Sequence, residues 1–273
     1  MTNEPLSSRL LPESNLKGKI ALVSGASQGI GLAVSKLLAA QGVSVMGVAR
    51  DTTQFSDALN ASESHSNQHY ACNADLSSAK GRQQLKAALL DWGYPHIVVA
   101  NVYARQKNHT LASDVSTQQT NTYADGYEEN IQYLLDILPE VLAFQRSQKF
   151  GRWIAVSSLV AEIGSPGQSR YSMIKASLTA LMKTLAVEEG KHYITANTVV
   201  PGLIETAGVK ARYAGSRLDA LAQMNVVGRA GTPMDVAHAI AFLASPMAGY
   251  ITGVSLPVCG GMDLGWSLQS PTP

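Results

Sequence analysis

Short apolar runs rich in β-branched residues alternate along the chain with longer segments in which apolar residues recur every three or four positions. Most of the short runs are apolar on both faces, which is typical of strands buried in the middle of a sheet. We predict strands at Lys19–Gly25, Val43–Arg50, His69–Asp75, His96–Asn101, Arg152–Ser158, Ile194–Gly202 and Val254–Gly261.

The longer segments predict helices near residues 29–42, 77–92, 125–148, 171–190 and 233–245. Strands that alternate with helices indicate parallel βαβ units, and strands that are apolar on both faces need helices on both sides of the sheet. The pattern therefore predicts an α/β fold, a Rossmann-type doubly wound parallel sheet of about seven strands. Ligands of such a sheet bind beyond the carboxyl ends of its strands.

The chain has 273 residues, of which 45% are hydrophobic and 15% are charged, and this length suits one large core. We expect an N-terminal extension over residues 1–16, one domain over residues 17–263 and a C-terminal tail over residues 264–273. The polar stretch at residues 60–69 is expected to be an exposed loop.

Charge and cysteine content exclude several classes of protein. The formal net charge of +1 comes from 21 basic and 20 acidic residues, so nothing indicates nucleic acid or an anionic membrane as a partner. Cys72 and Cys259 lie outside any metal-ligand spacing, and His65 and His69 fall on the polar loop, so no metal site is predicted. Without a signal-peptide core or a run of roughly 18 apolar residues, we expect a cytoplasmic protein that acts on a small molecule.

Gly25, Gly29 and Gly31 follow the first strand and open the next helix in the sequence SGASQGIG. Glycines let the backbone turn tightly and approach a pyrophosphate, while the helix N-terminus offers free N–H groups and a partial positive charge. A glycine-rich turn without a ligand is the alternative. The position between a strand and a helix, at the start of a βαβ unit, favours dinucleotide binding.

The second strand ends in VARDTTQ, and this end is expected beside the adenosine ribose of the dinucleotide. An acidic residue there selects NAD(H), whereas a cation favours the 2′-phosphate of NADP(H). Arg50 lies at the tip and Asp51 one residue beyond, so we predict NADP(H), with NAD(H) less favoured. A solvated surface charge is the alternative for Arg50. Asp75 and Leu76, after the third strand, are candidates for contact with the adenine.

Tyr171 and Lys175, in the sequence YSMIK, are four residues apart, which places both side chains on one face of a helix. A nearby ammonium favours the phenolate, and it moves the pKa of a tyrosine from about 10 toward neutral pH. Tyr171 can then pass a proton to or from a substrate oxygen. A tyrosine and a lysine four residues apart also occur by chance in a chain with ten tyrosines, so other motifs have to decide whether this pair is catalytic.

Residues 17–263 resemble the short-chain dehydrogenase/reductase family, and within it the 3-oxoacyl-[acyl-carrier-protein] reductases. The resemblance rests on several motifs in the expected order: SGASQGIG, a serine thirteen residues before the tyrosine, YSMIK, NTVVPGLIET, and GRAGTPMDVAHAIAFLAS followed by ITG. It implies an oxidoreductase that transfers a hydride between a nicotinamide and a ketone or secondary alcohol.

The resemblance also implies roles for individual residues. Tyr171 would be the general acid/base, Lys175 would tune it and hold the nicotinamide ribose, and Ser158 would hydrogen-bond the substrate carbonyl, with Ser157 as the neighbouring alternative. Asn130 would hold a water that links Lys175 to solvent, and a helix-surface asparagine is the alternative.

Pro201, Gly202, Ile204 and Thr206 would line the nicotinamide, with the Ile204 N–H and Thr206 reaching the carboxamide. The full set of expected cofactor-binding residues follows from the motifs and the resemblance together. They are Gly25, Ser27, Gln28, Gly29, Ile30, Gly31, Arg50, Asp75, Leu76, Asn101, Tyr171, Lys175, Pro201, Gly202, Ile204 and Thr206. The resemblance implies a homotetramer built on the helices near 125–148 and 171–190, which carry apolar residues around much of their circumference.

The chain departs from the family pattern in three places. It has Ala100-Asn101-Val102-Tyr103 where N-N-A-G is usual, its polar segment between Tyr103 and Asn130 is longer, and Cys259 replaces the acid of a final V-D-G-G. No catalytic group is lost, so activity is expected. Asn101 is expected to bridge neighbouring backbone beside the cofactor.

The substrate side of the site is less defined by the sequence. Tyr103 and Arg105 either contact substrate or belong to a rearranged loop. The segment Leu203–Gly231 is expected to close over substrate, and Tyr213 within it is a further candidate contact.

The sequence leaves three functions open. The first is NADP(H)-dependent reduction of a 3-oxoacyl thioester or a related secondary-metabolite ketone, free or bound to a carrier protein. The second is a dehydrogenase of a small cyclic or steroid-like alcohol. The third is a catalytically silent NADP(H)-binding partner subunit, against which the intact set of Asn130, Ser158, Tyr171 and Lys175 argues.

Overall fold

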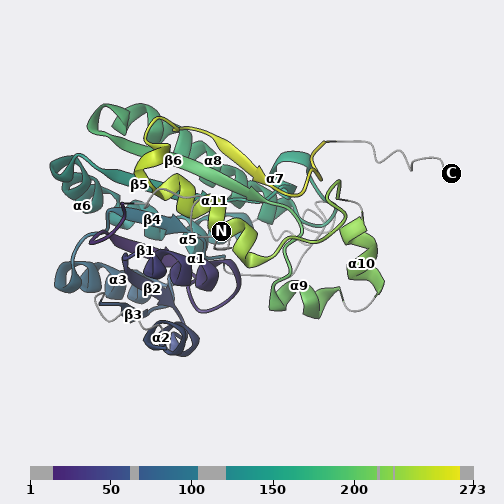
Figure 1. Cartoon of the computed structure of the whole chain (residues 1–273), viewed down its shortest axis with the longest axis horizontal. Coiled ribbons are helices and arrows are strands. Elements are labelled where there is room, and N and C mark those ends of the chain that lie inside the picture. Colours follow the sequence, from purple (N-terminus) through teal and green to yellow (C-terminus); the bar gives the residue numbers. More distant parts are fainter. Residues whose placement is uncertain (1–14, 62–67, 104–120, 214–215, 224, 265–273) are drawn as a thin grey trace, which may run out of the picture.

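The computed structural model describes residues 15–61, 68–103, 121–213, 216–223 and 225–264. Arg105, His65 and most of the expected terminal extension and tail lie outside the described residues. The described part of the chain forms an α/β domain around one sheet (Figure 1).

The sheet has seven strands, and every neighbouring pair is parallel, which confirms the predicted fold. In spatial order they are β3 (Tyr70–Asn73), β2 (Ser44–Ala49), β1 (Ile20–Ser24), β4 (Ile97–Ala100), β5 (Gly151–Val156), β6 (Ile194–Pro201) and β7 (Ser255–Val258). The chain order reverses between β1 and β4, and ligands of doubly wound sheets bind at such a reversal.

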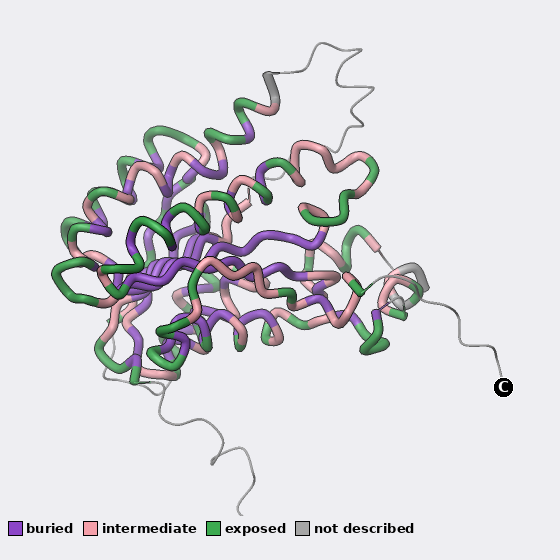
Figure 2. Tube along the Cα trace, turned by 90° about the horizontal axis from the view of Figure 1, so that it is seen from above, coloured by how far each residue is buried: buried purple, intermediate pink, exposed green. Residues whose placement is uncertain are grey.

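Helices cover both faces of the sheet. Within the described residues they are α1 (Gly29–Ala40), α2 (Thr53–Asn60), α3 (Ala79–Trp92), α5 (Asn121–Asn130), α6 (Gln132–Gln148), α7 (Val160–Ile163), α8 (Ser169–Glu189), α9 (Ala207–Arg212), α10 (Ser216–Gln223) and α11 (Pro233–Ala244), with 3₁₀ turns at Gly190–His192 and Pro246–Ala248. Figure 2 shows the buried strands between helices whose outer sides are exposed.

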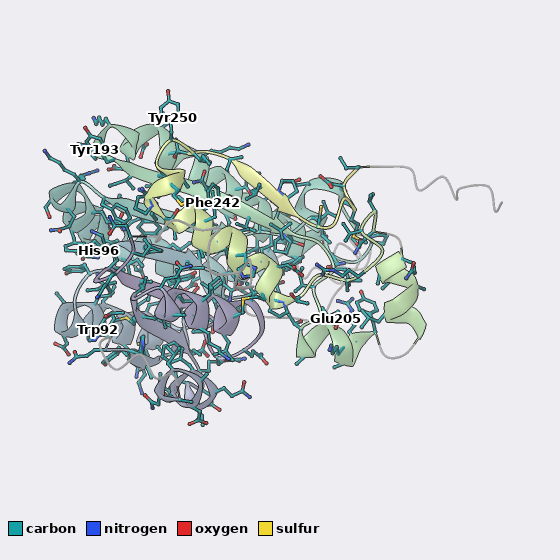
Figure 3. All side chains as sticks on the ribbon, in the orientation of Figure 1. Trp92, His96, Tyr193, Glu205, Phe242 and Tyr250 are labelled. Carbon is teal, nitrogen blue, oxygen red and sulfur yellow. The ribbon has the colours of Figure 1, made fainter. Side chains whose placement is uncertain are left out.

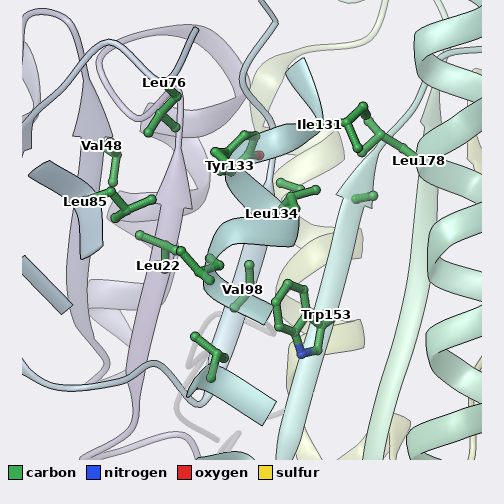
Figure 4. Close-up of a cluster of buried hydrophobic side chains, with 14 of the residues drawn as sticks. Leu22, Val48, Leu76, Leu85, Val98, Ile131, Tyr133, Leu134, Trp153 and Leu178 are labelled. Atoms are coloured by element: carbon green, nitrogen blue, oxygen red, sulfur yellow. The ribbon is translucent and has the colours of Figure 1, made fainter. Parts of the chain in front are cut away.

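Two hydrophobic clusters fill the space between the sheet and its helices. One packs α3, α6 and α8 on one face; in Figure 4, Leu22 and Trp153 of the sheet lie beside Leu134 of α6 and Leu85 of α3. The other packs α1 and α11 on the opposite face. The inner strands β1, β2, β4, β5 and β6 therefore bury both of their faces, as their unbroken apolar sequences predict. The edge strands β3 and β7 stay partly exposed.

The expected helix over residues 125–148 is wrong in one respect, because it is divided at Ile131 into α5 and α6. The side chain of Asn130 donates from Nδ2 to the carbonyl of Gly126, 2.8 Å away and four residues earlier. A side chain that bonds this carbonyl competes with the backbone N–H and tends to bend a helix. Asn130 consequently ends α5.

Four helices are absent from the prediction: α2, α7, α9 and α10. Each has four to eight residues, which is too short for an apolar period of 3.6 to be recognised. Figure 1 shows α9 and α10 together beyond one end of the sheet.

The apolar residues of α6 and α8 are mostly used within the chain. Ile137 and Val141 of α6 and Leu178 and Met182 of α8 are all buried against the sheet, whereas Met173 is 58% exposed. The apolar residues around these helices are therefore mostly needed inside the chain and do not by themselves indicate a contact with a second copy. The homotetramer loses this support and stays a prediction.

The two ends of the sheet differ in chemistry. Figure 3 shows Trp92, His96 and Tyr193 at the end away from Glu205, which precedes α9. His96 accepts a hydrogen bond at Nδ1 from the Ile20 N–H, and burial lowers its pKa to about 4. A neutral, bonded histidine there is structural. Among the described residues, no helix is long and apolar enough to cross a bilayer.

Candidate active site

A cleft of about 630 Å³ lies at the carboxyl ends of the strands, a volume typical of small-molecule sites. It runs from the turn between β1 and α1, past the ends of β2 to β5, to α8 and the segment after β6. Its lining includes Gly25, Ser27, Gln28, Gly29, Ile30, Arg50, Asp75, Leu76, Asn101, Tyr103, Glu129, Ser157, Ser158, Tyr171, Lys175, Pro201, Gly202, Ile204 and Thr206. Residues predicted from motifs almost two hundred positions apart therefore share one cleft.

The glycine turn is packed too tightly for side chains. A Cβ on Gly25, whose φ is +67°, would lie 2.9 Å from Nδ2 of Asn101, and a Cβ on Gly31 would lie 2.1 Å from the carbonyl oxygen of Gly25. Gly31 is buried and does not line the cleft, so its assignment as a direct cofactor contact is corrected. Its lack of a side chain lets α1 approach the end of β1.

Asn101 holds this turn in place from the end of β4. Its Nδ2 donates to the carbonyl oxygens of Ser24, at 3.0 Å, and Gly25, at 3.3 Å. The backbone N–H groups of Asn101 and Val102 donate to Oγ of Ser24, at 2.9 and 3.1 Å. Asn101 therefore bridges neighbouring backbone. Ser24 was not among the predicted site residues. Its position directly before Gly25 was the feature of the sequence from which it could have been predicted.

The end of β2 distinguishes Arg50 from Asp51. Arg50 is exposed and lines the cleft, whereas Asp51 does not. Asp51 accepts hydrogen bonds at Oδ1 from the backbone N–H and the hydroxyl of Thr53, at 2.9 and 2.7 Å, and these bonds lower the pKa of its carboxyl group. The acid that argued for NAD(H) is thus turned toward the start of α2.

Asp75 and Leu76 lie where the third strand ends. Asp75 accepts hydrogen bonds at Oδ1 from the backbone N–H and the hydroxyl of Ser77, at 3.1 and 2.7 Å. Leu76 is almost fully buried, but both residues line the cleft near Arg50.

Tyr171 and Lys175 project from the first half of α8 into the opposite part of the cleft. The Nζ of Lys175 donates to the carbonyl oxygen of Val156, 2.8 Å away, and lies 6.0 Å from the centre of the Tyr171 ring. Lys175 is 3% exposed, and this burial lowers its pKa to about 8. Its ammonium is therefore close to losing its proton at neutral to mildly alkaline pH.

The two serines after β5 are used differently. Ser157 donates from Oγ to the backbone carbonyl of Lys175, 2.9 Å away, so its hydroxyl holds α8 against the sheet. Ser158 accepts a longer hydrogen bond of 3.3 Å from the Val160 N–H, which leaves its hydroxyl hydrogen available for another acceptor. This difference favours Ser158 as the group that meets a substrate oxygen.

The N-terminal part of α8 is docked on α5. Arg170 forms an ion pair with Glu129, with 2.9 Å between Nη2 and Oε2, and Tyr123 and Ser169 share a hydrogen bond of 2.8 Å. Asn130 is buried, so the alternative of an exposed helix-surface asparagine is wrong. Neither Arg170 nor Glu129 was predicted, because a charged pair between distant segments leaves no local pattern.

Gly126 allows this docking. A Cβ there would lie 2.5 Å from Nε of Arg170 and 2.8 Å from Cδ1 of Ile174. Gly126→Ala is therefore expected to lower the free energy of unfolding by about 1 kcal/mol, because the Arg170 and Ile174 side chains would have to shift and the higher helix propensity of alanine offsets only part of that cost. Urea unfolding measures this change. Gly190→Ala is the control, because nothing lies within 4 Å of its Cβ position; equal stability of the two variants would contradict the prediction.

The segment after β6 closes the cleft. Thr206 caps α9, accepting at Oγ1 from the Val209 N–H at 3.3 Å. A Cβ on Gly202 would lie 2.8 Å from Cβ of Cys259, and the thiol of Cys259 donates to Oδ1 of Asp263 at 2.9 Å. The cysteine that replaces the usual acid thus packs beneath this segment. Tyr213 lies outside the cleft lining, with its ring 5.4 Å from the Arg212 guanidinium.

Comparison with known proteins identifies the family to which this chain is similar. A family model described as "Enoyl-(Acyl carrier protein) reductase" matches residues 25–263. The chain is 36% identical to 3-oxoacyl-[acyl-carrier-protein] reductase FabG of Vibrio cholerae, over 91% of this chain and 98% of that protein, and equally identical to FabG of Escherichia coli K12, with the same shares covered. A solved "short chain dehydrogenase/reductase family protein" is 27% identical, with a TM-score of 0.77, over 91% of this chain and 99% of that one.

The chain belongs to the short-chain dehydrogenase/reductase family. The predicted family and the predicted class of enzyme, an oxidoreductase, are thereby confirmed. This short-chain dehydrogenase/reductase is also similar to a solved "putative betaketoacyl-ACP reductase", with 27% identity and a TM-score of 0.77. The match covers 91% of this chain and 100% of that one.

Proposed function

We propose that this protein is an NADP(H)-dependent reductase that transfers a hydride to the carbonyl carbon of a ketone, with a 3-oxoacyl thioester as the substrate class, free or bound to a carrier protein. The observation that carries the proposal is one continuous cleft with the glycine turn and Arg50 at one end and Ser158, Tyr171 and Lys175 at the other.

The residues of the cleft fit a dinucleotide. The positions of Gly25 and Gly31 exclude side chains, and Gln28 provides no side-chain cap for α1, so the N–H groups of its first turn can meet a pyrophosphate. Arg50 would meet the 2′-phosphate, and Pro201 to Thr206 would line the nicotinamide. When bound, the nicotinamide ring supplies the hydride.

The remaining groups handle the substrate oxygen. Ser158 would donate a hydrogen bond to the carbonyl oxygen, and the hydroxyl of Tyr171 would give that oxygen a proton as the hydride reaches carbon. The ammonium of Lys175 would stabilise the phenolate left on Tyr171. Because its pKa is about 8, Lys175 would also release a proton to that phenolate. The family resemblance implies that Lys175 would recover a proton from solvent through Asn130, which is buried and lies outside the cleft lining.

Two observations favour a ketone over a carbon–carbon double bond, although the matched family model is described as an enoyl reductase. The curated relatives at 36% identity are named 3-oxoacyl reductases. A serine and a tyrosine in one cleft also suit protonation of an oxygen. The small cyclic or steroid-like alcohol is the second candidate, since Tyr103 gives the cleft an aromatic wall that the usual glycine lacks.

A panel of substrates tests the proposal. Purified protein is mixed with NADPH and, separately, with 3-oxoacyl thioesters, 2-enoyl thioesters, cyclic ketones, steroid ketones and quinones, and absorbance at 340 nm is followed. The highest kcat/KM is expected with a 3-oxoacyl thioester. A preference for enoyl thioesters or steroids would overturn the substrate class, and binding of NADPH without any turnover would favour the silent partner.

Arg50→Gln is expected to weaken NADPH binding by about ten- to a hundred-fold, because a charge-assisted contact to phosphate contributes about 1.5–3 kcal/mol. NADH has no 2′-phosphate, so its affinity should change little. Fluorescence titration with both cofactors measures the effect. Lys80→Gln, which removes an exposed charge outside the cleft lining, is the matched control; equal losses for NADPH and NADH would contradict the role of Arg50.

A further inference from the structure

Tyr103 is an unexpected neighbour of the reacting groups. It lies three residues beyond the end of β4, is half-buried, lines the cleft and packs against the cluster between the sheet and α8. At this place the family pattern has a glycine, which could make no side-chain contact. The large ring in this chain therefore makes contacts that a glycine at this position could not make.

The ring of Tyr103 meets both members of the proposed proton-transfer pair. Its centre is 4.8 Å from the centre of the Tyr171 ring, and the two planes are inclined by 85°, the edge-to-face arrangement that aromatic pairs prefer. The Nζ of Lys175 lies 5.5 Å from the centre of the Tyr103 ring, within the range of a cation–π contact.

The contacts of the Tyr103 ring restrict the orientation of the Tyr171 side chain, which α8 by itself does not fix. The helix fixes the spacing of Tyr171 and Lys175 along its axis, but a tyrosine on a helix face still has freedom about its side-chain bonds. An aromatic ring approaching from β4 restricts that freedom from the other side of the cleft. The buried ammonium of Lys175, which donates to the Val156 carbonyl, also gains a favourable aromatic surface.

We propose that Tyr103 is a positioning residue that orients the Tyr171 phenol and supports the Lys175 ammonium through its aromatic ring. This inference rests on the proposed ketone reduction and adds to it a group outside the usual set. This role requires a flat aromatic ring. Phenylalanine at position 103 should therefore preserve the role of Tyr103, whereas leucine should not.

Kinetics of Tyr103→Phe and Tyr103→Leu test this, with NADPH and the best ketone of the panel. The Phe variant should keep kcat within about threefold of the unaltered protein, whereas the Leu variant should lose about ten- to a hundred-fold in kcat, because small misplacements of a reacting group have effects of this size. The KM values for NADPH and ketone should move by less than about threefold. Tyr103→Met, which has a long side chain but no ring, repeats the test if the Leu variant folds poorly.

Tyr94→Leu is the matched control. Tyr94 also pairs with an aromatic ring, that of Phe144 at 6.2 Å between ring centres, but it lies outside the cleft lining. Its loss should lower the melting temperature without lowering kcat. A folded Leu variant with normal kcat would overturn the proposal, and so would a Phe variant as impaired as the Leu variant, since the hydroxyl would then carry the role.

A measurement without turnover separates this inference from the proposed function. With 3-fluorotyrosine incorporated, the ¹⁹F resonance of Tyr171, assigned by its absence in Tyr171→Phe, should be narrow in the unaltered protein and in Tyr103→Phe. It should shift and broaden in Tyr103→Leu. If the resonance changes in Tyr103→Leu but the protein reduces no ketone, the proposed function is rejected and the positioning role of Tyr103 stands. If the resonance is unchanged in Tyr103→Leu, the positioning role of Tyr103 is rejected.

Discussion

Tyr171→Phe is expected to lower kcat for ketone reduction by about 10²- to 10⁴-fold, the usual contribution of a positioned general acid. The substitution removes the proton that the carbonyl oxygen needs and keeps the ring that contacts Tyr103. NADPH affinity should stay within about threefold, because the phosphates would be held at the other end of the cleft. Steady-state kinetics and fluorescence titration measure the two effects.

A second tyrosine provides the control for this variant. Tyr127 lies on α5, is 44% exposed and is outside the cleft lining, so Tyr127→Phe should leave kcat unchanged. Retained turnover in Tyr171→Phe would remove Tyr171 as the acid. Loss of both turnover and NADPH binding would instead indicate that the substitution disturbs the cleft as a whole.

The strands and the glycine turn at one end of the cleft could be predicted because their signals are local. A buried parallel strand is apolar on both faces, and a tight strand-to-helix turn requires glycine, so short sequences suffice. The parallel arrangement then brings Gly25, Arg50, Asp75, Asn101 and Ser158 to one edge of the sheet. Motifs far apart in the sequence meet because the carboxyl ends of all the strands face the same way.

The contacts that orient the site could not be predicted, since they join segments with no common pattern. The ion pair between Arg170 and Glu129, and the close approach that Gly126 allows, depend on how α5 lies against α8. The division at Ile131 follows from one side-chain hydrogen bond of Asn130. The sequence marks Tyr103 as unusual, but its contact with Tyr171 appears only when β4 and α8 are in place.

The two ends of the cleft are held in place by different parts of the chain. The turn that would meet the cofactor is held by the tight packing at Gly25 and Gly31 and by the side-chain amide of Asn101. The groups that would move protons are held by contacts from three other parts of the chain: the Tyr103 ring after β4, Glu129 of α5 through its ion pair with Arg170, and the backbone carbonyl of Val156 in β5. Substitutions in the supporting residues should therefore change kcat more than cofactor affinity.

Lys175→Met is expected to change how stability depends on pH. Burial lowers the pKa of Lys175 to about 8, whereas an unfolded lysine has an ordinary pKa of about 10.4. Between these values the unfolded chain binds more protons than the folded protein, so the unaltered protein gains stability as pH rises from about 8 toward 10. The gain, on the order of 2–3 kcal/mol by pH 10, should be missing in the variant.

Urea unfolding of both proteins at pH 7 and pH 10 measures this difference. The variant also loses the hydrogen bond to the Val156 carbonyl, but that loss is the same at both pH values and cancels in the comparison. Lys183→Met, which removes an exposed lysine from the same helix, is the matched control. If the difference in free energy of unfolding between the unaltered protein and Lys175→Met is the same at both pH values, the ammonium is stabilised in the folded protein as well as it is in water. Lys175 could then not return a proton to Tyr171 near neutral pH.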